Sequence, residues 1–264
     1  MGSATREALA TAVGTLDTFA GSIDLSTGEQ LLDAGRIIGG SAQLRVALAD
    51  HSAEGANKAG IIGALFSSFT PAARAVLTSV VEARWSSDDD LVAGIEELGI
   101  RAVAASAPSG LSVESELFAF SRAVSSDSEL ELAVGSKLAS PESKTALVQE
   151  LLGGKASAQT LAIIRQLVQQ PRDRRIGEML RFAITVVADQ AGLSVATVTA
   201  ASPLAPAQLE RLIKGLASQY GRELRVNQVI DPSILGGIRI QIGDDLIDGT
   251  VVAKLNDLRL QLAR

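Results

Sequence analysis

The stretch of sequence best suited to chemistry lies near the C-terminus and is rich in glycine and aspartate. Residues 229–251 read VIDPSILGGIRIQIGDDLIDGTV. A glycine pair can bring backbone N–H groups close to a phosphate, and several carboxylates can together bind a metal ion. The candidate phosphate ligands are therefore Gly236 and Gly237, and the candidate metal ligands are Asp231, Asp244, Asp245 and Asp248.

The spacing of these residues favours turns over a ligand site. A P-loop needs a lysine and a serine or threonine that open a helix after its glycines, and a dinucleotide site needs a different glycine spacing. Neither pattern follows Gly237. The aspartates stand before Pro232, after Gly243 and before Gly249, where turns favour this residue type. We therefore interpret the stretch as the turns of a small sheet.

The rest of the chain offers few groups for catalysis. It contains no cysteine and one histidine, His51, so a thiolate nucleophile and a paired-histidine metal site are excluded. No G-x-S-x-G motif is present to indicate a Ser-His-acid triad. Three aspartates, 88–90, follow Ser87, where their charge compensates the positive end of a helix. We predict no catalytic residue, no cofactor and no bound metal.

Composition narrows the class of protein further. Apolar residues make up 47% of the 264 and aromatic residues only 3%, which favours closely packed helices. The net charge of -6 argues against nucleic acid as a partner, because phosphate binding needs a basic surface. No apolar run reaches the length of about 20 residues that a membrane-spanning helix needs. An interaction protein is the better class.

Helical spacing of apolar residues extends from Thr5 to about Gln190. A first helix is predicted from Thr5 to about Ala20. Serine, threonine and first-turn proline then mark later helix starts. These signals are a capping box at Ser26 and Glu29, and the cap-plus-proline pairs Thr70-Pro71 and Ser140-Pro141.

An internal repeat organises this helical region. The segment 31–48 aligns without a gap with 117–134, at an offset of 86 residues. After one added residue, the apolar positions Val76 and Leu77 fall on Ile163 and Ile164. A fixed period of this kind indicates duplication of a structural unit, here about five short helices. The additional first helix precedes only the first copy.

Beyond Gly192 the apolar period changes from helical to alternating. Strands are predicted at 195–199, 224–230 and 238–242, with a fourth short extended piece at 246–249. Helices are predicted at 206–220, ended by Gly221, and at 251–262. The expected fold is mainly α plus a small α/β domain. The expected domains are a helical copy one at 1–108, a helical copy two at 109–193 that lacks its own first helix, and the α/β domain at 194–264.

The C-terminal residues resemble a known family. The matching segments are VTAASPLAPAQLERL from residue 198, YGRELRVNQVIDPSILGGIRIQIGDDLIDGTV from residue 220 and KLNDLRLQL from residue 254. They resemble the delta subunit of rotary ATP synthases, called the oligomycin-sensitivity-conferring protein in mitochondria. Departures are small, such as Ser202 before the proline and Thr250 in place of serine. The turns that carry the resemblance are Pro203, Asp231, Pro232, Gly236, Gly237, Gly243, Asp244, Asp248 and Gly249.

The helical region resembles the family by plan, since the family places a six-helix bundle before this α/β module. Family members are typically shorter by the length of the repeat, so copy one's helices resemble an insertion. Longer, duplicated chains occur among actinobacterial synthases. The resemblance implies a stator subunit without catalysis of its own, peripheral on the cytoplasmic face of the cell membrane and associated with the membrane only through the complex. The implied partners are the N-terminal helices of the alpha subunit and the C-terminal end of a separate peripheral-stalk b subunit.

In the family, the groove for the alpha-subunit helix involves the first and fifth helices. By position, we expect the first helix to contribute Ala8 and Leu9. For the other helix we expect either Leu91 and Ile95 in copy one, or Arg175, Ile176 and Met179 in copy two. Packing in the core explains these apolar residues equally well. We expect the bundle that includes the first helix to contact the catalytic head.

Two other classes of function stay open on the sequence alone. A freestanding helical adaptor would share only the C-terminal module with the family. A small-molecule enzyme would need a well-formed polar pocket between bundle and sheet. Co-purification with ATP synthase subunits would argue against the first, and such a pocket would favour the second.

Overall fold

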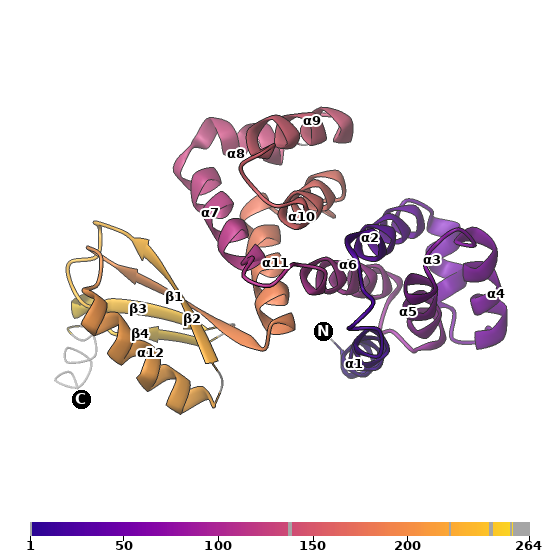
Figure 1. Cartoon of the computed structure of the whole chain (residues 1–264), viewed down its shortest axis with the longest axis horizontal. Coiled ribbons are helices and arrows are strands. Elements are labelled where there is room, and N and C mark those ends of the chain that lie inside the picture. Colours follow the sequence, from indigo (N-terminus) through magenta and orange to yellow (C-terminus); the bar gives the residue numbers. More distant parts are fainter. Residues whose placement is uncertain (1, 137–138, 222, 243–244, 254, 256–264) are drawn as a thin grey trace. The chain divides into compact units, whose positions relative to one another are not determined.

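The computed structural model describes residues 2–136, 139–221, 223–242, 245–253 and 255 (Figure 1). The chain divides into two compact units, Met1–Val187 and Ala188–Arg264. The first is helical and the second contains a four-stranded sheet. The expected class, mainly α with a small α/β domain, is confirmed. The boundary expected between the two helical copies stays a prediction.

The first unit begins with α1 (Ser3–Asp17), which starts two residues before the predicted helix. Thr5 is therefore inside the helix, where its hydroxyl donates to Asp90 at 2.8 Å and accepts from the Ser86 N–H at 3.1 Å. The helices that follow fall into two sets. The first set is α2 (Leu25–Gly39), α3 (Ala42–Ala49), α4 (Gly55–Leu65), α5 (Pro71–Glu82) and α6 (Asp88–Ala105), and the second is α7 (Val113–Ser126), α8 (Ser128–Gly135), α9 (Pro141–Leu152), α10 (Ala158–Gln169) and α11 (Ile176–Gln190).

The two sets follow the repeat closely. Both ends of α3 and α8 are displaced by 86 residues, and both ends of α5 and α10 by 87. Cap residues correspond as well, since Thr70 caps α5 and Ser157 caps α10 through their side-chain oxygens. Predicted caps at Thr70 and Ser140 are confirmed, and Ser87 caps α6 just before the three aspartates. The duplication inferred from the sequence repeat is therefore also present in the helix boundaries.

The predicted start of α2 is wrong. Ser26 does not cap this helix, because Asp24 is the cap and its Oδ1 accepts from the Thr27 N–H at 2.8 Å. The same oxygen accepts from the hydroxyls of Ser26 and Thr27. These hydrogen bonds, first the one from the Thr27 hydroxyl, lower the pKa of Asp24. A charged acceptor at the helix start outcompetes the neutral hydroxyl because it also interacts with the helix dipole.

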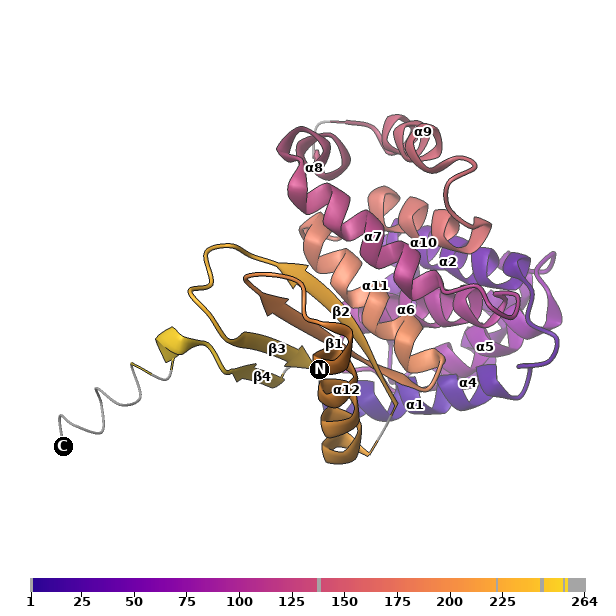
Figure 2. The same ribbon diagram turned by 60° about the vertical axis from the view of Figure 1, so that its left-hand side comes forward.

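Helix α6 differs from the others in being buried on every side. Its buried residues include the consecutive run from Ile95 to Ile100. By contrast, the buried residues of α1 lie on one face, at Thr5, Ala8, Ala12 and Leu16. Figures 1 and 2 show α6 between α5 and α10, and it packs along α2 as well as against α1 and α10. A helix buried all round must pack against neighbours on both sides.

The second unit is a mixed sheet with the strand order β2-β1-β3-β4. Strands β1 (Leu193–Ala200) and β2 (Glu223–Ile230) are parallel and are joined through α12 (Pro206–Tyr220). Strands β3 (Ile238–Ile242) and β4 (Asp245–Asp248) extend the other edge in antiparallel register. The core joins Val198, Ile240 and Ile242 of the sheet to Leu216 of α12. Residues 251–253 and 255 are helical, and the rest of the predicted final helix lies outside the described residues.

The glycine- and aspartate-rich stretch forms contacting turns. Gly236 and Gly237 have positive φ angles of 142° and 81°, which glycine adopts most easily. The Gly249 N–H donates to the carbonyl of Ile238 at 2.9 Å, and the Val251 N–H donates to the carbonyl of Gly236 at 3.1 Å. Gly243 and Asp244 lie outside the described residues. The two described turns therefore pack backbone against backbone.

Candidate functional site

A groove of about 890 Å³ runs between α1 and α5. Its walls come from residues three and four apart on each helix, so one face of each helix lines it. The side chains are mostly alanine, serine and threonine, with charged residues at the rim. The lining residues are Ser3, Ala4, Glu7, Ala8, Thr11 and Thr15 from α1 and Ala75, Thr78, Ser79, Glu82, Ala83 and Arg84 from α5 and the residues after it.

Packing of α1 against the core and against α5 fixes the groove in place. Ala8, Ala12 and Leu16 are buried in the core of the first copy. The hydroxyl of Thr15 donates to the Ser79 hydroxyl at 3.1 Å and links α1 directly to α5. Small residues along the floor let another helix approach closely, as close helix packing in general requires. The arrangement is suited to receiving a helix rather than to chemistry.

The groove differs in part from the sequence prediction. Ala8 lines it, and Leu9 is half-buried and packs against the core. Leu91 and Ile95 do not line it, because both are fully buried inside the first copy. They belong to α6, whereas the fifth helix in chain order is α5. The expected role of Leu91 and Ile95 as partner-binding residues stays a prediction.

The three residues expected from the second copy lie at the start of α11. Ile176 and Met179 are buried, and Arg175 is exposed just before the helix. None of them lines the α1/α5 groove. Their expected role as partner-binding residues stays a prediction. The structure therefore brings Ala8 together with groove residues that are not among the predicted site residues.

The groove residues that were missed carry a weak signal. The missed residues Ala4, Thr11 and Thr15 form a stripe with the predicted Ala8 at helical spacing of four and three residues. Such a stripe contains alanine and threonine but no large apolar residue, so it lacks the pattern that predicts an apolar binding face. Small size, not hydrophobicity, is the property these positions share.

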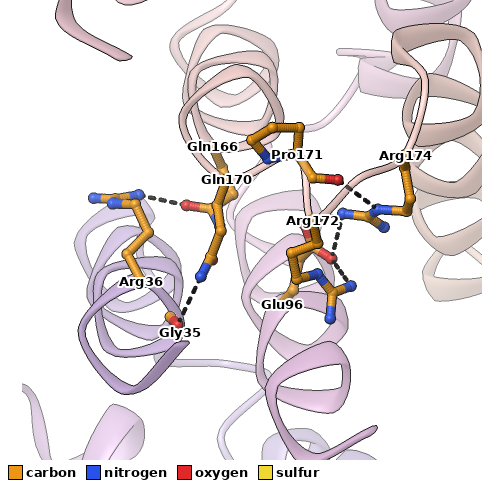
Figure 3. Close-up of polar contacts among 8 residues, drawn as sticks. All are labelled: Gly35, Arg36, Glu96, Gln166, Gln170, Pro171, Arg172 and Arg174. Carbon is orange, nitrogen blue, oxygen red and sulfur yellow. Dashed lines mark hydrogen bonds and ion pairs between the residues drawn. The ribbon is translucent and has the colours of Figure 1, made fainter. Parts of the chain in front are cut away.

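A second polar site joins the two copies (Figure 3). The Glu96 side chain is fully buried on α6 and accepts hydrogen bonds from two arginines of the loop before α11. Arg172 Nη2 lies 2.5 Å from Oε2, and Arg174 Nη2 lies 2.7 and 2.9 Å from Oε1 and Oε2. The Arg174 guanidinium also lies 5.7 Å from the ring centre of Phe182. Burial lowers the pKa of Arg172, against the attraction of Glu96.

The loop that carries these arginines has an unusual backbone. Arg172 and Asp173 both have positive φ angles, 48° and 60°. Such angles cost free energy in residues other than glycine, so surrounding contacts must hold them. The paired Glu96 provides such contacts on Arg172. The loop is thus fixed onto α6 by charge as well as by packing.

Helix α2 makes a second group of contacts with the second copy, to residues of α10 and of the loop that follows it. Arg36 donates to the side-chain oxygen of Gln166 and to Asp33. Gln170 accepts from the Gln166 amide at 3.1 Å and donates to the carbonyl of Gly35 at 3.3 Å. Figure 3 shows both groups of contacts side by side across the start of the α10–α11 loop. We call this group of residues the joint. It consists of Gly35, Arg36, Glu96, Gln166, Gln170, Pro171, Arg172 and Arg174.

Equivalent contacts recur at equivalent places in the two copies. Gln30 Oε1 accepts from the Thr70 N–H at 2.7 Å, which links α2 to the start of α5. In the second copy Glu116 Oε2 accepts from the Ser157 N–H at 3.0 Å, which links α7 to the start of α10. Burial raises the pKa of Glu116, but hydrogen bonds from Ser157 and Thr160 outweigh it and lower the pKa overall. The two copies therefore share this hydrogen bond, but its acceptor is a neutral amide in the first copy and a carboxylate in the second.

The aspartates of the C-terminal turns act within the turns. Asp231 Oδ1 accepts from the Ser233 hydroxyl and N–H, and Asp248 Oδ1 accepts from the Thr250 N–H. Side-chain hydrogen bonds, from Ser233 and Thr250 respectively, lower the pKa of both carboxyls. Among the described residues, no group of three or more potential metal-ligating side chains comes together. No described helix is long and apolar enough to cross a membrane.

Comparison with known proteins assigns the chain to a family. The family model of the ATP synthase delta (OSCP) subunit matches residues 101–262. The ATP synthase subunit delta of Leifsonia xyli is 51% identical over 263 residues and that of Streptomyces griseus is 37% identical over 270, each alignment covering 100% of both chains. A chain of the Toxoplasma gondii mitochondrial ATP synthase hexamer is similar at 19% identity and a TM-score of 0.43, over 64% of this chain and 96% of that one, too distant to add to the assignment.

The full-length relatives bear on the adaptor function that the sequence left open. Their similarity extends through both helical copies, so it is not limited to a shared C-terminal module. A freestanding adaptor is therefore not favoured. The chain belongs to the ATP synthase delta (OSCP) subunit family, and it is a stator subunit of the rotary ATP synthase.

Proposed function

We propose that the α1/α5 groove receives the N-terminal helix of an alpha subunit of the catalytic head. The second unit then holds the C-terminal end of a separate peripheral-stalk b subunit. The chain contributes no catalytic residue of its own. It is peripheral on the cytoplasmic face of the cell membrane and associates with the membrane only through the complex.

The groove between the first and fifth helices is the observation that carries this proposal. The family resemblance implies docking between these two helices, and here α1 and α5 form both walls. An amphipathic helix binds such a groove by laying one face along it. The rim carries Glu7, Glu82 and Arg84, so an incoming helix with a basic residue beside its buried face would be complementary.

The joint supports the mechanical part of the proposal. Rotor torque would turn the catalytic head unless a static connection resisted it. A connection resists torque only if its parts keep their relative orientation. Contacts from Glu96 to Arg172 and Arg174 give the two helical copies such a connection, because directional hydrogen bonds fix angles as well as distances.

The extent of the family match supports a division of labour between the copies. The matched span, 101–262, includes α7 to α11 and most of the second unit, and it starts within α6. Residues before this span, which include α1, lie outside the matched family model but align with the full-length relatives. We infer that the copy with α1 contacts the head and that copy two lengthens the stator or braces the stalk.

Reconstitution tests this function. Membranes stripped of this subunit should regain coupled ATP synthesis when the intact chain is added. Thr11→Arg places a long charged side chain on an exposed groove position and should prevent recovery. Ala10→Arg, the matched control, adds the same side chain at the next residue, which does not line the groove. Full recovery with Thr11→Arg would contradict the proposal.

A further inference from the structure

Helix α10 carries the repeat counterpart of the groove wall on α5. The two helices have the same length, and their ends are displaced by the same 87 residues. This displacement relates the four helical groove residues of α5 to four residues of α10. Ala75, Thr78, Ser79 and Glu82 correspond to Ala162, Arg165, Gln166 and Gln169.

Helix α2 of the first copy lies on this counterpart face. A smaller cavity of about 160 Å³ separates the helices, and the same four residues of α10 line it. Its opposite wall is Glu29, Leu32, Asp33 and Arg36 of α2. The Arg36–Gln166 and Gln170–Gly35 hydrogen bonds hold α2 there. At Gly39, a Cβ would collide with the Gln170 amide, so the approach is close.

Helix α6 takes the position of a first helix for the second copy. It ends at Ala105 shortly before α7 begins at Val113, just as α1 ends at Asp17 shortly before α2 begins at Leu25. It contacts α10, as α1 contacts α5. Because α2 packs along α6 and also on α10, α2 lies between the second copy's counterparts of α1 and α5.

We propose that α2 occupies, in the second copy, the docking position that the incoming helix takes in the first. The inference rests on the proposed function for the identity of that position. The second copy's groove is closed by the chain itself, and polar residues of α2 replace an outside partner. The duplicated chain therefore exposes one docking groove, and the duplication extends the stator without doubling its contact with the head.

Matched cysteines test this occupancy, because the chain has no cysteine of its own. Ala75→Cys and Ala162→Cys place thiols at the same repeat position in the two copies. Ala162 is 6% exposed, while Ala75 is partly exposed in the groove. A thiol reagent should label the full chain at Cys-substituted Ala162 at least about tenfold more slowly than at Ala75, since labelling there requires α2 to open. Equal rates would overturn the inference.

An alpha-subunit N-terminal peptide separates this inference from the proposed function. The peptide should slow labelling of Ala75→Cys and leave Ala162→Cys unchanged. Failure of the peptide to protect Ala75→Cys would contradict the docking proposal. The two labelling rates measured without peptide would still test whether α2 covers Ala162. Protection of Ala162→Cys by the peptide would overturn the inference, because it would show a second open groove.

Two further variants guard against a folding defect at the buried site. Glu82→Cys and Gln169→Cys are the pair at the end of the same faces, and neither residue is buried. Gln169→Cys should be labelled more slowly than Glu82→Cys.

Arg36→Ala should accelerate labelling of Ala162→Cys and leave labelling of Ala75→Cys unchanged, because it removes the hydrogen bond to Gln166. No acceleration would contradict the role given to α2.

Discussion

Arg174 donates hydrogen bonds to both carboxylate oxygens of Glu96, at 2.7 and 2.9 Å, across 78 residues of sequence. Glu96 lies on α6, and Arg174 lies in the loop that leads to α11. A fully buried carboxylate is tolerated only when it is paired and hydrogen-bonded. This pairing therefore fixes how the second set of helices packs on the shared helix α6.

Replacing Glu96 should destabilise the first unit. Glu96→Gln removes the charge that two arginines share, and we expect a loss of about 2–3 kcal/mol of unfolding free energy in urea. The loss stays below that of a fully buried pair because both arginine side chains are 24% exposed. Glu210→Gln is the control, since its ion pair with Lys214 is exposed and should contribute at most about 0.5 kcal/mol. An equal loss of unfolding free energy in the two variants would contradict the claim that the buried Glu96 pair stabilises the first unit.

Acid should weaken the second copy's α7–α10 link more than its counterpart. The folded pKa of Glu116 lies below its ordinary value of 4.5, so its contribution to stability is present above that value and is lost as the pH falls through the folded pKa. Glu116→Gln copies the neutral Gln30 of the first copy. The stability difference between the intact chain and this variant, measured by urea unfolding, should shrink from pH 7 to pH 3. A constant difference would contradict the pKa shift.

Two helical glycines should respond oppositely to alanine. A Cβ at Gly94 would overlap the ring of Trp85, which is buried and donates to the Val80 carbonyl at 2.7 Å. Gly94→Ala should therefore cost about 1–3 kcal/mol through overpacking. Gly14→Ala on α1 meets nothing within 4 Å and should stabilise by about 0.5–1 kcal/mol. Thermal unfolding followed by circular dichroism measures both. A stabilising Gly94→Ala would show that the Trp85 ring can move.

The turn that carries the family resemblance should be equally intolerant. Gly237 has a φ of 81°, and a Cβ there would lie 2.4 Å from the Gly249 carbonyl oxygen. Gly237→Ala should thus destabilise the second unit by about 1–3 kcal/mol. Gly215→Ala, within α12 and in open space, is the matched control and should not destabilise. Hydrogen exchange of the sheet amides reports on the second unit, and unchanged protection in Gly237→Ala would count against the packed turn.

Elements with strong local signals could be predicted from the sequence. The helix 206–220 has a first-turn proline and a terminal glycine, and the strand 238–242 has strict alternation, so both are confirmed to the residue. The repeat was also predictable, because the two copies keep apolar residues at equivalent helix positions. At α2 the prediction failed by two residues, since Asp24, Ser26 and Thr27 all favour a cap and only the contact geometry selects Asp24.

The groove and the joint could not be predicted in the same way. Leu91 and Ile95 have the apolar spacing of binding anchors, but packing on both sides of α6 buries them. The groove instead consists of small residues such as Ala4 and Thr78, whose pattern gives no signal on its own. Glu96 and Arg174 are far apart in sequence, and nothing local indicates that they meet. Such sites depend on tertiary packing.

Titration of the full chain with an alpha-subunit N-terminal peptide is the most direct test of the central claim. Calorimetry should show one peptide bound per chain. Thr11→Arg in the groove should abolish this binding, and Ala10→Arg beside it should leave it within about threefold, or roughly 0.7 kcal/mol. Unchanged affinity in Thr11→Arg would contradict the claim that the α1/α5 groove receives the catalytic head.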